Sequence, residues 1–306
     1  MRTYEDLKIM QQAPLAVKIQ MTKQRIKEWI DEFGEDGVYV SFSGGKDSTV
    51  LLHIVRQDYP SVEAVFSDTG LEYPEIKEFV KTFDNVDIVR PEMIFDEVIR
   101  TYGYPMISKE VGHKFEAYNK NKTWAKPYID GTAKQPNGEK SRYCVDRWKG
   151  IASMDFKISN KCCDVTKKKP LKNYQKRTGR NPIIATMACE SQMRFHAWIM
   201  NGCNAFDSAD KKSAPMSFWT EQDVLQYIIE NNIPIAKPYG DVVDINGSLK
   251  TTKLKRTGCI YCGYGSHREK QSRWLLLKES HPKLYNYCIN GGATTMTAYG
   301  NLIKRA

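Results

Sequence analysis

Short apolar runs and amphipathic segments alternate along the first third of the chain. Residues 37–42, 61–67 and 86–90 are rich in β-branched and aromatic residues, which predicts buried strands. Between them, residues 47–57 and 74–83 place their apolar side chains at helical spacing, which predicts helices that pack on the sheet. Because strands and helices alternate, we expect an α/β fold with a doubly wound, mainly parallel sheet.

The pattern on either side of this region is less regular. Residues 16–33, which include Val17, have apolar positions at roughly helical spacing, and this predicts a helix near the N-terminus. Residues 103–182 hold many Lys, Asn, Gly and Pro residues with little periodicity. We expect loops and short helices there, covering an active site.

Regular elements return after residue 180. A strand is predicted over residues 181–187, and a helix over 220–230 with Thr220 as its N-cap and Asp223 three residues later. A further helix is predicted near residues 268–288, before a Gly-rich tail. The expected parts of the chain are an N-terminal helical extension (1–34), an α/β domain (35–240, with the loop-rich insertion 103–182) and a loop-rich, cysteine-bearing helical C-terminal segment (241–306).

The composition is that of an ordinary globular protein. Hydrophobic residues make up 41% and charged residues 27% of the chain, which permits a sizeable core. The chain contains no run of about 18 apolar residues, and its first residues are polar rather than an apolar leader. We therefore expect no membrane span and a cytoplasmic location.

The chain has a net charge of +10, from 46 Lys and Arg residues against 36 Asp and Glu residues. An excess of this size favours polyanionic partners, namely nucleotides, sulfonucleotides, DNA or RNA. Much of it falls between Lys109 and Arg180, including the lysine triplet at 167–169. Such a local stripe is better evidence for nucleic-acid binding than the total charge. A basic but ordinary solvated surface stays open as the alternative.

A glycine-rich turn, Ser43-Gly-Gly-Lys-Asp-Ser48, joins the first predicted strand to the first predicted helix. The glycines let the backbone approach phosphate oxygens, and the helix N-terminus attracts the anion. Lys46 adds a mobile positive charge, and Asp47 is a candidate Mg²⁺ ligand. The spacing of a Walker A loop is absent. We expect nucleotide binding by Ser41, Ser43, Gly44, Gly45, Lys46, Asp47 and Ser48, with Lys46, Asp47 and Ser48 as the catalytic residues.

This turn matches the SGGKDS signature of the PP-loop ATP pyrophosphatases, which the chain resembles. Three later segments are similar to those of the PAPS-reductase branch of that class: Phe66-Ser-Asp-Thr-Gly-Leu-Glu-Tyr-Pro-Glu, Cys189-Glu-Ser-Gln-Met-Arg and Phe218-Trp-Thr-Glu-Gln-Asp-Val-Leu-Gln-Tyr-Ile. The resemblance implies an adenine-nucleotide α-hydrolase fold and cleavage of ATP between its α- and β-phosphates. It also implies that the nucleotide site includes Asp68, Thr69, Glu190 and Arg194.

Two separated cysteine pairs form the second chemical feature. Eight cysteines in a chain expected in the cytosol indicate metal or redox chemistry rather than disulfides. The pairs Cys162-Cys163 and Cys259-x-x-Cys262 provide four thiolates, which suit Zn²⁺ or a [4Fe–4S] cluster, and the spacing leaves both open. The surrounding segments resemble the CC-x-x-x-K-x-x-PL and GC-x-x-C segments of the adenylylsulfate reductases, and this resemblance implies the cluster.

The remaining cysteines are expected to have lesser roles. Cys144 is an alternative to one member of the adjacent pair as a ligand. Cys189, Cys203 and Cys288 are expected to be ordinary buried thiols. The reductases carry their nucleophilic thiol in a C-terminal Glu-Cys-Gly-Leu-His motif, which this chain lacks, and Cys288 is only a faint substitute for it.

Two further departures separate the chain from the reductases. The reductases generally lack the Lys-Asp of the turn, which this chain keeps as Lys46 and Asp47. The reductases usually carry a Gly-x-Arg segment before the Glu-Ser pair, and its arginine binds a sulfate or phosphate group. Residues 185–187, at this place in the chain, lack that arginine. Together with the missing thiol, these departures favour an ATP pyrophosphatase over a reductase.

We therefore expect an enzyme that adenylates an acceptor, releases pyrophosphate and couples this to sulfur transfer, with nucleic acid as the expected acceptor. The expected cofactors are Mg²⁺ and a [4Fe–4S] cluster, with zinc as the alternative. The expected partners are ATP or a sulfonucleotide, DNA or RNA, a cysteine desulfurase as sulfur donor and a second copy of the chain. Two alternatives stay open: an adenylylsulfate or phosphoadenylylsulfate reductase of sulfate assimilation, and a non-catalytic, zinc-stabilised nucleic-acid-binding protein.

Overall fold

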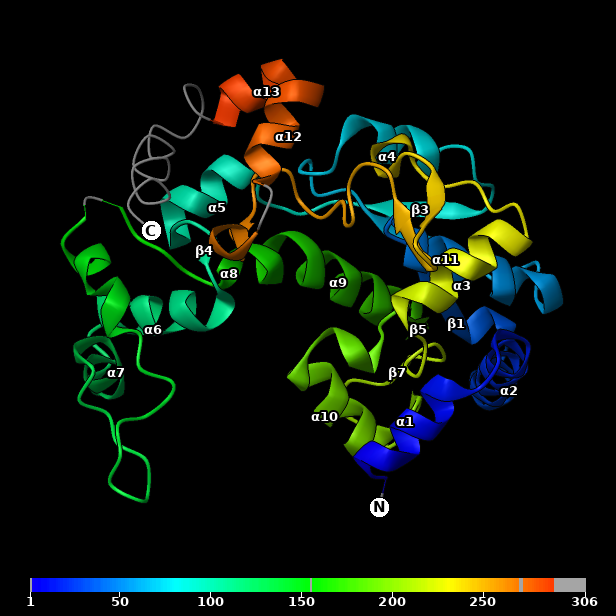
Figure 1. Ribbon diagram of the computed structural model, residues 1–306, viewed down its shortest axis with the longest axis horizontal. Helices are drawn as coiled ribbons and strands as arrows, with labels where there is room; N and C mark the ends of the chain where they lie inside the picture. The colour runs from blue at the N-terminus through cyan, green and yellow to red at the C-terminus, as the bar shows by residue number, and fades with distance from the viewer. Residues whose placement is uncertain (1, 155, 270–271, 289–306) are drawn as a thin grey trace. The chain divides into compact units, whose positions relative to one another are not determined.

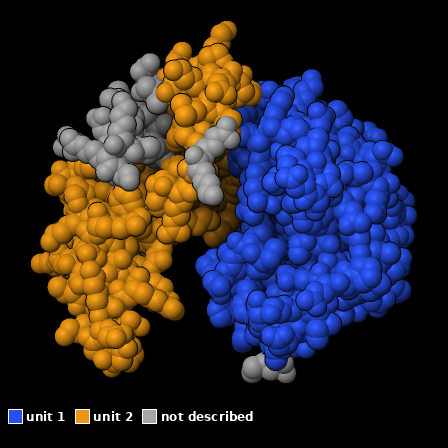
Figure 2. All heavy atoms as spheres, viewed as in Figure 1, with its two compact units in different colours: residues 1–68, 72–90, 170–258 blue, residues 69–71, 91–169, 259–306 orange. Residues whose placement is uncertain are grey.

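The computed structural model describes residues 2–154, 156–269 and 272–288 of the chain (Figure 1). The chain divides into two compact units, which Figure 2 colours separately. Unit 1 comprises Met1–Asp68, Glu72–Arg90 and Pro170–Gly258, and unit 2 comprises Thr69–Leu71, Pro91–Lys169 and Cys259–Ala306. The domain boundaries expected at residues 34 and 240 stay a prediction. No helix in the described ranges is long and apolar enough to span a membrane.

Unit 1 is built on a six-stranded sheet. Across the sheet the order is β3 (Val86–Val89), β2 (Ala64–Ser67), β1 (Val38–Ser41), β5 (Asn181–Ile183), β7 (Lys212–Ser213) and β6 (Asn204–Ala205). All neighbouring strands are parallel except β6, which runs antiparallel to β7. This sheet confirms the expected α/β class, and its first strands lie where the apolar runs predict them.

The strand order reverses beside β1. The chain runs from β1 through α3 (Lys46–Asp58) to β2 and through α4 (Pro74–Val80) to β3, whereas β5 pairs with the opposite edge of β1. Val40 of β1 therefore has Ala64 of β2 on one side and Ile183 of β5 on the other. In open parallel sheets, ligands bind outside the carboxyl ends of the strands at such a reversal. The residues that follow β1 and β5 are thus candidates for the site.

Helix α3 packs against α2 (Leu15–Phe33) and α11 (Glu221–Glu230) inside unit 1. Its predicted core positions are all fully buried, namely Val50, Leu51, Ile54 and Val55. Removing each such side chain from water stabilises the fold by about 1.5–3 kcal/mol. The glycine-rich turn therefore precedes a helix that is firmly held in the core.

Helix α11 begins at the predicted cap. The backbone N–H of Thr220 donates to the Asp223 carboxylate at 2.7 Å, and the Thr220 hydroxyl accepts from the Asp223 N–H. The same carboxylate lies 2.8 Å from Nζ of Lys18, which is buried. Because this ion pair turns Lys18 inward, Val17 is 47% exposed. The helix predicted over residues 16–33 is present as α2, and Val17 is an apolar position of that helix that does not face the core.

The other elements of unit 1 are short. They are α1 (Tyr4–Gln12), η1 (Glu35–Gly37), α9 (Lys169–Thr178, whose first residue belongs to unit 2), η5 (Ala188–Glu190), α10 (Gln192–Asn201), η6 (Lys237–Tyr239) and the hairpin of β8 (Val242–Ile245) and β9 (Ser248–Thr251). The strand predicted over 181–187 ends early. After the hydrogen bond from the N–H of Ile184 to the carbonyl of Ser213, the chain leaves the sheet and turns into η5.

Unit 2 corresponds largely to the segment predicted to hold loops and short helices. Its elements are α5 (Phe95–Tyr102), β4 (Met106–Ile107), α6 (Lys109–Asn119), η2 (Thr123–Ala125), α7 (Lys126–Asp130), η3 (Asp146–Ser153), α8 (Lys161–Cys163), the π-helical turn η4 (Asp164–Lys168), β10 (Gly263–Tyr264), η7 (Ser266–Arg268), α12 (Arg273–Ser280) and α13 (Pro282–Asn286). The single helix predicted near 268–288 is wrong, because Pro282 cannot continue α12 and starts α13 instead. The predicted Gly-rich tail lies outside the described residues.

Candidate nucleotide site and cysteine cluster

The turn after β1 folds as its glycines predict. Gly45 is the N-cap of α3, and Gly44 has a φ of 67°, a conformation that suits glycine. A Cβ atom on Gly44 would also lie 2.8 Å from Cγ2 of Ile76 and 2.9 Å from Cγ2 of Val80, both on α4. Position 44 therefore requires glycine for two reasons: its positive φ and the close approach of α4.

Replacing Gly44 by alanine should lower the free energy of unfolding more than replacing Gly247 does. Both changes place a side chain at positive φ, which costs about 1–2 kcal/mol, and Gly44→Ala adds a clash worth about 1–3 kcal/mol. Gly247 is the matched control because its φ is 77° and no atom lies within 4 Å of its added Cβ. Urea unfolding measures both losses, and equal losses would argue against the packing of α4 on the turn.

The hydroxyl groups of the turn bond mainly to the turn itself. Ser48 Oγ donates to the carbonyl of Gly45 at 2.9 Å and lies 3.0 Å from Ser43 Oγ, while Thr49 Oγ1 donates to the same carbonyl at 3.0 Å. Ser41 ends β1 and is partly buried. These bonds fix the shape of the turn, and direct contact of the serines with phosphate stays a prediction.

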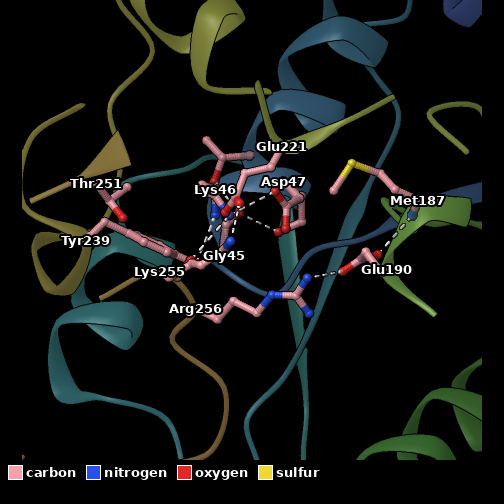
Figure 3. Close-up of polar contacts among 12 residues, drawn as sticks. Gly45, Lys46, Asp47, Met187, Glu190, Glu221, Tyr239, Thr251, Lys255 and Arg256 are labelled. Atoms are coloured by element: carbon pink, nitrogen blue, oxygen red, sulfur yellow. Dashed lines mark hydrogen bonds and ion pairs between the residues drawn. The ribbon is translucent and has the colours of Figure 1, made fainter. Parts of the chain in front are cut away.

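Lys46 lies at the centre of a polar cluster in unit 1 (Figure 3). Its side chain is only 3% exposed, and Nζ lies 3.3 Å from Asp47 Oδ1 and 3.4 Å from Glu221 Oε1. Nζ also donates to the carbonyl of Lys255 and lies over the ring of Tyr239. A buried ammonium group with only long contacts to two carboxylates is well placed to exchange one of them for a phosphate oxygen.

The carboxylates beside Lys46 differ in their surroundings. Among the described residues, Asp47 Oδ1 is buried and has no hydrogen-bond donor, although it lies 3.3 Å from the Lys46 ammonium group. Burial raises the pKa of Glu221, but hydrogen bonding to Lys255 and the charge of Lys46 outweigh burial, so the net pKa is lowered. Glu221 is therefore ionised at neutral pH, and the free oxygen of Asp47 fits a Mg²⁺ ligand.

A second polar cluster follows β5, where Glu190 forms ion pairs with two arginines. Glu190 Oε2 accepts from the N–H of Met187, and Oε1 lies 3.2 Å from a guanidinium nitrogen of Arg256 (Figure 3). Glu190 Oε2 also forms an ion pair with Arg194 of α10. Burial lowers the pKa of Arg194, and the neighbouring charge of Arg256 lowers it further. Two guanidinium groups on one carboxylate leave a net positive charge, which favours binding of an anion.

Sequence reasoning missed part of this arrangement. Arg256 and Lys255 come from the segment after the β8–β9 hairpin, and Glu221 and Tyr239 come from α11 and η6. The one signal for the first two was the basic run Lys253-Leu-Lys-Arg256 just before the Cys-x-x-Cys pair. Arg256 is the most important of these residues for anion binding, because residues 185–187 lack the arginine expected before Glu190-Ser191.

The other predicted nucleotide ligands take part in local contacts. Asp68 Oδ1 lies 2.6 Å from Nζ of Lys77, and Oδ2 accepts from Arg90 at 3.3 Å. In unit 2, Thr69 is buried, and its hydroxyl accepts from the N–H of Leu71. Contact of Asp68 and Thr69 with adenosine stays a prediction.

In unit 2 the structure brings the two cysteine pairs together. Cys162 is buried in a cluster with Leu71 and Val98, against which Cys259 packs, while the N–H of Ile260 donates to the carbonyl of Leu71 at 2.8 Å. Burial raises the pKa of the Cys162 thiol, and the neighbouring thiols of Cys163, Cys259 and Cys262 raise it further. Segments almost a hundred residues apart therefore meet at one cysteine cluster, which consists of Cys162, Cys163, Cys259 and Cys262.

The thiols of this cluster do not converge on one point. Within the described ranges, no three Cys, His, Asp or Glu side chains are placed to hold a single metal ion. The two adjacent cysteines immediately precede the π-helical turn η4, and such turns are frequent at functional sites.

The other cysteines are dispersed. The thiol of Cys144 lies 3.6 Å from the carbonyl of Ala133, and Cys144 is not among the groups that raise the pKa of Cys162. Cys203 and Cys288 are buried, as expected. Cys189 is exposed, which contradicts the prediction of a buried thiol. The reason is its place in η5, the turn beyond the carboxyl end of β5 that precedes α10.

The chain matches a family model and is similar to several known proteins. The model of the phosphoadenosine phosphosulfate reductase domain matches residues 37–120 and 92–263. The adenosine 5′-phosphosulfate reductase of Staphylococcus epidermidis is 26% identical over 253 residues, which is 81% of each chain. That of Geobacillus kaustophilus is 27% identical over 208 residues, covering 66% of this chain and 67% of the other. The phosphate complex of phosphoadenylyl-sulfate reductase from Candida auris aligns with a TM-score of 0.41 at 15% identity, over 81% of this chain and 98% of the other.

Proposed function

The chain belongs to the phosphoadenosine phosphosulfate reductase domain family, and from this premise we propose that it cleaves ATP between the α- and β-phosphates to drive sulfur transfer, with nucleic acid as the acceptor. The observation that carries the proposal is the buried ammonium group of Lys46 beside the Asp47 carboxylate, at the N-terminus of α3. These groups and the helix N-terminus are what a triphosphate and its Mg²⁺ require.

In this proposal the two polar clusters of unit 1 share the charges of the nucleotide. The turn at Gly44 and Gly45 faces the phosphates, and Lys46 exchanges a contact with Glu221 for a phosphate oxygen. Asp47 would hold Mg²⁺, which supplies further positive charge to the phosphates when bound. Arg194 and Arg256 add the positive charge that attracts the anion.

The proposed chemistry is a displacement at the α-phosphorus. An acceptor oxygen attacks that phosphorus, the bond to the α–β bridging oxygen breaks, and pyrophosphate leaves with the bonding electrons. Sulfide-level sulfur then attacks the acceptor atom that bears the adenylated oxygen, and AMP leaves with that oxygen. Lys46 stabilises the negative charge that develops on the departing pyrophosphate, the kind of fixed electrostatic contribution that dominates phosphoryl chemistry.

The cysteine cluster supports a [4Fe–4S] cofactor in unit 2. Four thiols from two segments match the donor set of such a cluster, and Cys259 packs against the buried cluster that contains Cys162. Each iron of a cluster takes its own thiolate, so the four donors need not converge as they would on one zinc ion. When bound, the cofactor would supply electrons or sulfur.

Reduction of a sulfonucleotide is the second candidate function. It is favoured by the relatives in Staphylococcus epidermidis and Geobacillus kaustophilus, which are adenosine 5′-phosphosulfate reductases. Such a reaction requires a reactive thiolate. Cys288 suits this role poorly, because it is buried and burial raises its pKa to about 12. Residues 289–306 lie outside the described residues.

Two assays on one anaerobic preparation test the proposal. The first supplies ATP and measures pyrophosphate, and the second supplies adenylylsulfate with a thiol reductant and measures sulfite. We expect pyrophosphate from ATP and no sulfite from adenylylsulfate. Sulfite without pyrophosphate would establish the reductase instead. Neither product, from colourless protein that contains zinc, would favour a non-catalytic protein.

A further inference from the structure

The basic stripe expected between Lys109 and Arg180 is largely neutralised along α9 and its neighbours. Lys168 lies 2.8 Å from Asp164, Arg177 pairs with Asp87, and Arg180 pairs with Glu63. Paired charges of this kind retain little attraction for a distant anion, because each cation is offset by a neighbouring carboxylate. The cations available to a polyanion must therefore be sought elsewhere in the insertion.

Exposed cations without acidic partners gather around α6, η2 and α7 of unit 2. Lys122, Lys126 and Arg142 are exposed, and no ion pair joins them to an acidic side chain in the described part of the chain. Lys122 and Lys126 flank η2, and α6, η2 and α7 pack on one another (Figure 1). This region therefore carries free positive charge on a folded support.

The same region exposes a connected set of aromatic rings, which we call the aromatic platform: His113, Trp124, Tyr128 and Tyr143. The Trp124 ring centroid lies 5.3 Å from that of His113 and 6.3 Å from that of Tyr128. Trp124 is 43% exposed and Tyr143 is 48% exposed. Leaving two large rings in water forgoes the stabilisation that burial would provide, so their exposure points to a binding role.

A buried lysine joins the platform into one unit. Nζ of Lys114 lies 5.2 Å from the ring centroid of Tyr128 and 5.8 Å from that of Tyr143, and pairs with Glu110 at 2.6 Å. Arg142 stacks over the Tyr143 ring at 5.0 Å and donates to its hydroxyl. These cation–π contacts hold the rings in place before a ligand arrives, which lowers the entropic cost of binding.

We propose that the aromatic platform binds single-stranded nucleic acid, with bases stacked on Trp124 and Tyr143 and phosphates near Lys122, Lys126 and Arg142. Exposed rings interleaved with unpaired cations are the combination that single-strand binding uses. Protein interfaces are instead depleted in lysine. The inference deepens the proposed function by naming the surface that holds the acceptor, and it rests on that function only for the identity of the acceptor.

Fluorescence anisotropy tests the proposal on the full chain without ATP. The probes are labelled oligothymidylate and oligouridylate of about 16 nucleotides, the upper range for one small binding module. We expect binding, with Trp124→Ala and Tyr143→Ala each weakening it by about tenfold or more. Trp124→Phe keeps a stackable ring and should retain most of the affinity. Tyr4→Ala is the matched control, because Tyr4 is 55% exposed but belongs to unit 1.

Salt dependence supplies the second readout. Replacing Arg142 or Lys122 by glutamine should reduce the slope of log Kd against log salt by about 0.7, the value for one phosphate contact to a single strand. The DNA and RNA probes together identify the preferred acceptor. The inference is overturned if the folded Trp124→Ala/Tyr143→Ala double variant binds both probes as tightly as the parent, or if neither probe binds the parent. Pyrophosphate release is scored separately, so failure of one proposal does not imply failure of the other.

Discussion

Replacing Lys46 by alanine should lower ATP-dependent pyrophosphate release by about 100- to 1,000-fold, the usual effect of removing a group that stabilises transition-state charge. The side chain of Lys46 is 3% exposed, so its ammonium group acts where water is largely excluded and charges interact strongly. Arg194 and Arg256 pair with Glu190 instead, and Lys255 is largely exposed, so none of them replaces the buried charge. The loss is measured as the rate of pyrophosphate release at saturating ATP.

Lys255→Ala is the matched control for this variant. Lys255 pairs with the same carboxylate, that of Glu221, at 2.7 Å, but its side chain is 72% exposed. Its removal should change the rate by less than about tenfold, because exposed ion pairs contribute little. Thermal unfolding of both variants distinguishes a loss of catalysis from a loss of folding. A third variant, Lys46→Arg, tests whether a positive charge at this position is enough for pyrophosphate release. A well-folded Lys46→Ala variant with the parental rate would refute the assigned role.

Replacing either Cys259 or Cys262 by serine should remove most of the iron and acid-labile sulfide from anaerobically purified protein. A serine hydroxyl is a poor replacement for a thiolate ligand, and loss of one of four ligands exposes an iron of the cluster. Because the two cysteines come from a single turn, both variants should show the effect. Cys162→Ser and Cys163→Ser should do the same if the adjacent pair supplies the other two ligands. Iron and sulfide analysis of each variant measures the loss.

Two cysteines outside the cluster serve as controls. Cys203 is buried in unit 1 and lies 3.2 Å from the Ser217 hydroxyl, so Cys203→Ser should keep the full iron content. Cys144→Ser decides the alternative ligand: retention of iron assigns the site to Cys162 and Cys163, and loss shows that Cys144 replaces one of them. Parental iron in every variant of the cysteine cluster would contradict the proposed cofactor site.

The central sheet and the glycine-rich turn were predictable because they depend on local signals. Apolar runs marked β1, β2 and β3, and helical spacing placed Val50, Leu51, Ile54 and Val55 in the core, where they are. The Thr220 cap was equally local. The inward turn of Lys18 was not predictable, because it depends on Asp223, 205 residues away. This ion pair buries Lys18, whereas its apolar neighbour Val17 is exposed.

The candidate site was predictable only where it is continuous in sequence. The turn around Lys46 and the Glu190–Arg194 pair each lie within one segment, and their motifs mark them. Arg256 and Glu221 join these groups through tertiary packing. Glu221 lies within the motif that begins at Phe218, but that motif does not show which groups Glu221 meets. The exposure of Cys189 likewise depends on where η5 leaves the sheet. The sequence also could not show that charges such as Lys168 and Arg177 are neutralised by acidic neighbours.

The identity of the bond broken in ATP tests the central claim most directly. ATP labelled at its α-phosphate is incubated with anaerobically purified protein and a single-stranded nucleic acid, and the labelled products are separated. Cleavage between the α- and β-phosphates predicts label in AMP or on the acceptor, with unlabelled pyrophosphate released. Labelled ADP with inorganic phosphate, or recovery of all the label as ATP, would contradict the account.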